Sequence, residues 1–144
     1  MTCPECGAHF ADANDSCGAR FDQLLALDHS RQEPWGSRHG LAFAVFALQH
    51  PGRFNQQTVA RAHELLTRVV AQREPLGDVV KDFRARPASD AHQSAYETTE
   101  IAAGRTPYSP FAVTIADLGD FTAEHYADLL DAWCRATLDA IAVL

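Results

Sequence analysis

Three cysteines near the start of the chain have the spacing of a metal-binding motif. Cys3 and Cys6 stand in Cys-Pro-Glu-Cys-Gly, where two intervening residues let both thiolates reach one ion and Gly7 permits the backbone to turn. Cys17 opens the first expected helix, whose positive end favours a thiolate. A redox Cys-x-x-Cys motif is the alternative, but the βαβ pattern that a thioredoxin-like site needs is absent. The three cysteines therefore predict a structural zinc (Zn²⁺) site.

A histidine is expected to supply the fourth ligand, because structural zinc takes four. The first two expected helices are joined by a short turn and should pack antiparallel, each about 20 Å long. The end of the second helix then lies level with the start of the first, which places His50 beside Cys17. His39 lies about 16 Å earlier along the same face, and His9 follows the cysteine pair by three residues. We place His50 first and keep His9 and His39 as alternatives.

The hydrophobic pattern predicts an all-α fold, a small helical bundle with an N-terminal zinc knuckle packed on the first two helices. Pro and Gly mark the breaks between helices. A chain of 144 residues suits a single domain, with residues 1–16 as the knuckle segment and 17–144 as the bundle. The expected N-caps are Asp15 or Ser16, Ser37 and Thr122. The expected helices cover residues 17–30, 37–50, 55–74, 76–83 and 122–143, with a helical turn over 114–118 and a long connection before it.

The composition excludes several classes of partner. With a formal charge of −7, one Lys and eleven scattered Arg, the chain is not expected to bind nucleic acid. The densest basic stretch, Lys81, Arg84 and Arg86, is interleaved with Asp82 and is expected to be a solvated face. No apolar run reaches the roughly 18 residues of a membrane span, and residues 1–10, with two cysteines and no apolar stretch, are not expected to be a signal peptide. We expect a cytoplasmic protein in which Cys134 is an ordinary buried cysteine.

Three histidines on separate expected helices are candidates for a second site. His39, His63 and His125 are expected to face the same way as core residues. Each one alone is best explained as a neutral, hydrogen-bonded core histidine, but three that converge would be able to build an internal metal site. The chain has no Glu-x-x-His or His-Glu-x-x-His pattern to complete a catalytic site. The catalytic residues are thus unknown, with these three as candidates.

The sequence of residues 38–52, in the second expected helix and the turn after it, resembles a segment of a bacterial family known as domain of unknown function 5946. Members of that family have Cys-Pro-x-Cys-Gly near the N-terminus, a later Cys that opens a helix, and a His-x-Leu-x-Val-x-x-Tyr-x-x-Gln-His-Pro segment. The sequence departs from this pattern at Phe43 and Phe46, where Val and Tyr are expected. The resemblance implies no activity and supports the motif assignment at Cys3, Cys6, Cys17, His39, Gln49, His50 and Pro51.

Two hypotheses of function follow. The first is a non-catalytic zinc-binding helical module that serves as an accessory or interaction protein, with a protein or a small molecule as its partner. The second is a metal-dependent, hydrolase-like enzyme that uses an open zinc position or the histidines at 39, 63 and 125. We favour the first, because the carboxylates that would complete a catalytic site are not found. The pattern does not predict an oligomeric state.

Overall fold

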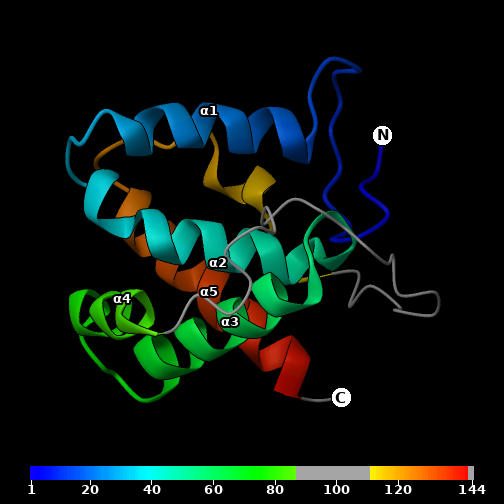
Figure 1. Ribbon diagram of the computed structural model, residues 1–144. Helices are drawn as coiled ribbons and strands as arrows, with labels where there is room; N and C mark the ends of the chain where they lie inside the picture. The colour runs from blue at the N-terminus through cyan, green and yellow to red at the C-terminus, as the bar shows by residue number, and fades with distance from the viewer. Residues whose placement is uncertain (87–110, 143–144) are drawn as a thin grey trace.

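The computed structural model describes residues 1–86 and 111–142, and the chain is all-α within them (Figure 1). An isolated bridge between Thr2 and His9 is the only extended pairing in these residues. None of the described helices has the length and apolar character needed to cross a membrane. The predicted fold class is confirmed. The main helices are α1 (Cys17–His29), α2 (His39–Gln49), α3 (Gln56–Leu66), α4 (Leu76–Ala85) and α5 (Tyr126–Ala142), with short helical turns η1 (Gly36–Arg38), η2 (Pro51–Arg53), η3 (Thr67–Ala71) and η4 (Ile115–Leu118).

Helix α2 lies at the centre of the bundle, with α1 on one side and α3 on the other (Figure 1). It is apolar on nearly every face, which is the pattern of a helix surrounded by other elements. Its residues from Ala44 to His50 are all buried, and it also packs against α5. Because α2 is enclosed in this way, the residues at its two ends are held in fixed positions.

Helices α1 and α2 run antiparallel, as the short connection between them predicts. The rings of Phe21 and Phe46 stack between them with centroids 4.0 Å apart and planes 3° from parallel. At the far end, Nδ1 of His39 lies 2.9 Å from the buried Oδ2 of Asp28. The start of α1 therefore lies beside the end of α2, which is where Cys17 and His50 stand.

Several helix boundaries differ from the predicted ones. Ser16 caps α1 by accepting a hydrogen bond from the Ala19 N–H at 3.0 Å, whereas the prediction of Ser37 as the cap of the second helix is wrong. Ser37 lies in η1 and donates to Glu33 instead. Helix α5 begins at Tyr126 because a turn over residues 123–125 precedes it. The long connection predicted over 87–110 and the end of the last helix at 143 lie outside the described residues.

Gln49 joins the end of α2 to the C-terminal part of the chain. Its side-chain amide donates to the Val113 carbonyl at 2.8 Å and to the Thr137 hydroxyl at 2.9 Å. The side chain is fully buried. A buried amide with both donors satisfied fixes the relative position of the segments it joins, because breaking either bond leaves a buried acceptor unpaired.

Replacing Gln49 with Ala should lower the free energy of unfolding by about 2–4 kcal/mol, because it removes two hydrogen bonds of a buried side chain and leaves a cavity. Urea titration followed by circular dichroism, with excess zinc present, measures the change. Gln23→Ala, at an exposed position of α1, is the matched control and should stay within about 0.5 kcal/mol of the parent. Equal effects of the two substitutions would contradict the role given to Gln49.

Candidate metal centre

The N-terminal residues form a short hairpin that points two thiols the same way. Gly7 has φ of +86°, a conformation that glycine adopts without strain, and its N–H donates to the Cys3 carbonyl at 2.9 Å. The Cys3 N–H in turn donates to the Ala8 carbonyl at 2.7 Å, and the Ala8 N–H points to the Cys6 Sγ at 3.4 Å. This is the geometry expected of a zinc knuckle, because both sulfurs and the turning backbone face one point.

The helices bring two further ligand atoms to the same point. Cys17, the first residue of α1, places its Sγ 3.5 Å from the Cys6 Sγ. His50 follows the last residue of α2, and its ring stacks on Phe46 at 4.1 Å between centroids. All four side chains are buried, and the ligand atoms of Cys3, Cys6, Cys17 and His50 lie within 4.8 Å of one another.

The orientation of the His50 ring leaves one nitrogen for the cluster. Nδ1 lies 2.8 Å from the Phe46 carbonyl, so it carries the proton and donates. Nε2 is buried and makes no hydrogen bond of normal geometry. A fixed Nδ1–H and a free Nε2 are the arrangement that metal-binding histidines adopt, since the second-shell hydrogen bond sets the tautomer and the ring direction.

The electrostatics of the cluster favour a bound cation. Burial tends to lower the pKa of His50, but the facing thiolates of Cys3 and Cys6 raise it to about 9. The hydrogen bond from Cys17 holds the pKa of the Cys6 thiol well below its usual range, while the same contact raises the pKa of Cys17. The pKa of Cys17 is raised because its thiol donates to Cys6 and is buried beside the thiolates of Cys6 and Cys3. A divalent cation would offset this effect, since it stabilises every thiolate at once.

The donor set fits zinc in its number, type and spacing. With Zn–S bonds of about 2.3 Å, two sulfurs of a tetrahedral site lie about 3.8 Å apart. The 3.5 Å between the Cys6 and Cys17 sulfurs is close to that value, and the 4.8 Å limit on the whole group leaves room for one ion. Three thiols and one imidazole are a common ligand set of structural zinc sites.

Glu5, between the two cysteines of the knuckle, ties the hairpin to the segment after His50. Its carboxylate accepts from the Gly52 N–H at 3.1 Å and from Nε of Arg53 at 3.0 Å. A backbone bond from the Phe111 N–H to the Cys6 carbonyl adds a third connection, at 3.1 Å. The sequence did not point to Glu5, because its hydrogen-bond donors, the Gly52 N–H and the Arg53 side chain, come close only through the position of η2.

The chain as a whole is similar to one family of proteins. A model described as a family of unknown function, DUF5946, matches residues 1–142. The chain belongs to this family. The match covers both the cysteine segment and the Gln-His-Pro segment, so the resemblance noted in the sequence is confirmed. No curated protein and no solved structure matches the chain. Membership of DUF5946 brings no activity with it.

In this DUF5946 chain, the two alternative fourth ligands lie away from the cluster. His9 is exposed, and its Nδ1 lies 3.2 Å from the Thr2 hydroxyl. It points outward because side chains alternate along the hairpin, with Cys3 and Ala8 inside and Thr2 and His9 outside. His39 stands at the opposite end of α2, paired with Asp28. Neither belongs to the group whose ligand atoms lie together.

The expectation that His63 and His125 face inward is wrong. His63 is exposed, because the buried face of α3 is formed by Val59, Ala62 and Leu65–Leu66, and apolar side chains are buried there at lower cost than an imidazole. His125 belongs to the turn before α5, and its side chain is 64% exposed. Among the described residues, the cluster at Cys3 is the one group of three or more potential ligands close enough to share an ion. The three histidines therefore do not form a second such group.

Replacing His50 with Ala should reduce zinc affinity, while His9→Ala should leave it unchanged, because only His50 directs a buried, free nitrogen at the sulfurs. Loss of one ligand should cost at least about tenfold in affinity. Competition with a chromophoric chelator measures the affinity of each variant. A larger loss in His9→Ala than in His50→Ala would contradict the ligand set.

Proposed function

We propose that this DUF5946 protein is a non-catalytic, zinc-containing helical module that acts as an accessory or interaction protein. The observation that supports the proposal best is the convergence of three buried thiols and one free imidazole nitrogen on a single point. Zinc is the metal of choice for such a set, because thiolate and imidazole ligands in tetrahedral arrangement suit Zn²⁺ better than harder cations.

The proposed zinc is structural because the protein supplies four ligands. A catalytic zinc keeps an open position for water or substrate beside three protein ligands. Here Cys6 and His50 are fully buried, and Cys17 is 2% exposed. Four protein donors in a closed pocket leave no coordination site for a substrate. An enzyme that uses an open zinc position is therefore not supported by this geometry.

The zinc would anchor a segment that has few other attachments. Within residues 1–16, the buried side chains are those of Cys3, Cys6, Ala8 and Phe10. An isolated hairpin of this size is marginal in water. Metal binding would join it to α1 through Cys17 and to α2 through His50, so the binding free energy would contribute directly to the order of the N-terminal segment.

The zinc assignment is tested by measuring metal content in two matched cysteine variants. Cys3→Ser removes a thiolate from the cluster, whereas Cys134→Ser changes a buried cysteine of α5 outside it. We expect about one zinc per chain in the parent and in Cys134→Ser, and a weakly held or lost zinc in Cys3→Ser. Mass spectrometry of metals after dialysis gives the stoichiometry. Unchanged zinc content in Cys3→Ser would overturn the assignment.

Removing the metal with a chelator should increase hydrogen exchange first in residues 1–16. The core between α2, α3 and α5 should stay protected, because it is formed by apolar side chains without help from the cluster. Exchange measured by mass spectrometry with and without chelator gives the comparison. Readdition of zinc is the control and should restore protection. Uniform loss of protection over the whole chain, or none in the N-terminal segment, would contradict the structural role.

A further inference from the structure

A groove between α2 and α4 lies at the opposite end of α2 from the cysteine cluster. It consists of two adjoining hollows of about 370 and 800 Å³, which share His39, Gly40, Val80 and Arg84. Both volumes fall within the range of small-molecule sites. We name these two hollows together the α2–α4 groove. Because His39 and His50 stand at opposite ends of α2, the properties of the groove are independent of the proposed zinc.

The floor of the smaller hollow is apolar. It is formed by side chains of three helices, with Phe43 from α2, Leu65 from α3, and Val80 and Phe83 from α4. Gly40 helps to keep the space open, because a Cβ built there would already touch the Val80 Cγ2 at 3.6 Å. An apolar floor of this kind binds hydrocarbon or aromatic groups through the hydrophobic effect.

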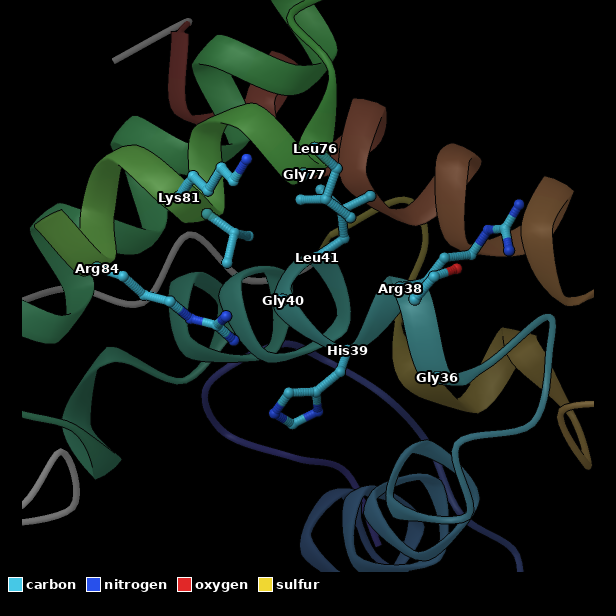
Figure 2. A pocket seen from close by; sticks show the side chains of 11 residues that line it. Gly36, Arg38, His39, Gly40, Leu41, Leu76, Gly77, Lys81 and Arg84 are labelled. Carbon is cyan, nitrogen blue, oxygen red and sulfur yellow. The ribbon is translucent and has the colours of Figure 1, made fainter.

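The rim of the groove carries positive charge. Arg61 and Arg84 line the smaller hollow, and Arg38, Lys81 and Arg84 line the larger one. Figure 2 shows Arg84 extending from α4 toward the start of α2, and His39 leaving α2 on the side of α1. No Asp or Glu is among the described residues that line either hollow. In a chain with a net charge of −7, this local excess of cations is unexpected.

Among the cations of the groove, Arg38 pairs with Glu33, whereas Arg61, Lys81 and Arg84 have no ion-pair partner among the described residues. Six of the Lys and Arg side chains in residues 1–86 and 111–142 form ion pairs, including Arg86, which pairs with Glu64. Five do not, and three of these five are Arg61, Lys81 and Arg84. Asp82, on the same helix, pairs with Arg68 and Arg86 instead of with the groove. Lys81, Arg84 and Arg86 were predicted to form one solvated basic face. In the structure Arg86 is paired with acidic residues, whereas Lys81 and Arg84 line the groove.

His39 adds a polar group with a fixed direction. Its Nδ1 bonds to Asp28, whose side chain is fully buried and does not line either hollow, while the ring itself is 42% exposed and lines both. The turn η1 runs directly into α2, and the His39 N–H donates to the Gly36 carbonyl, so the start of the helix adds no free donor to the groove. Because Nδ1 of His39 donates to Asp28, Nε2 of the neutral ring is an acceptor, and the arginine side chains of the rim supply the donors that favour an anion.

We propose that the α2–α4 groove binds a small amphiphile with one anionic head group, a carboxylate or a phosphate, and an apolar body. The head group is held by Arg61 and Arg84, and the apolar body lies on Phe43, Leu65, Val80 and Phe83. The ligand class follows from the charge complementarity of the rim and the apolar character of the floor. A simple inorganic anion would not contact the apolar floor, and a neutral hydrocarbon would not neutralise the cations of the rim.

The test uses the zinc-loaded protein and three probes with the same chain length: decanoate, decyl phosphate and decanol, each below its aggregation limit. Calorimetry gives affinities, and amide NMR shifts locate the site. We expect both anionic probes to bind more tightly than decanol and to shift the amides of His39, Gly40 and Arg84. The tighter of the two anions identifies the head group. No saturable binding of either anion, or equal binding of decanol, would overturn the proposal.

Matched variants distinguish binding in the groove from non-specific attraction of the anion to positive charge. The double variant Arg61→Ala/Arg84→Ala should weaken anion binding about tenfold, while Arg31→Ala/Arg73→Ala removes two arginines that line neither hollow and should not. All four arginines are exposed, so both proteins should fold. Gly40→Leu should block the groove and abolish binding of both anions. Equal weakening in the two double variants, or full binding by Gly40→Leu, would overturn the assignment of the groove.

Discussion

The attachment of residues 1–16 to the helices depends on one convergence, in which three thiols and an imidazole meet where the hairpin, the start of α1 and the end of α2 come together. Burial and the neighbouring thiolates disfavour ionisation of the Cys17 thiol. A divalent cation would stabilise all the thiolates at once. The antiparallel packing of α1 on α2 brings Cys17 and His50 together.

Helix α2 connects the two regions of interest. Its buried length fixes His50 at one end and His39 at the other, so the cysteine cluster and the α2–α4 groove are separated by the helix itself. Side-chain hydrogen bonds at both ends fix α2 relative to its neighbours: His39 bonds to Asp28 of α1, and Gln49 bonds to Val113 and to Thr137 of α5. The cysteine cluster at one end and the open groove at the other are the two features on which the proposed binding role rests.

The sequence predicted much of this arrangement because the relevant rules are local. Cysteine spacing and Gly7 define the hairpin, and the lengths of two antiparallel helices bring His50 to Cys17. Local rules do not predict the rotation of a helix about its own axis, because tertiary packing determines which face is buried. In α3, Ala62 and Leu66 face inward and His63 is exposed to solvent. Asp28 was missed although it continues the stripe of Cys17, Phe21 and Leu24. An acidic residue on such a stripe is a signal for a buried partner.

X-ray absorption at the zinc edge of the purified protein tests the central claim most directly, because it reports the number and type of ligand atoms on the metal. The account predicts one zinc with three sulfur ligands at about 2.3 Å and one nitrogen at about 2.0–2.1 Å. A spectrum with fewer than three sulfurs, or with an oxygen ligand from exchangeable water, would contradict the closed, structural centre formed by Cys3, Cys6, Cys17 and His50.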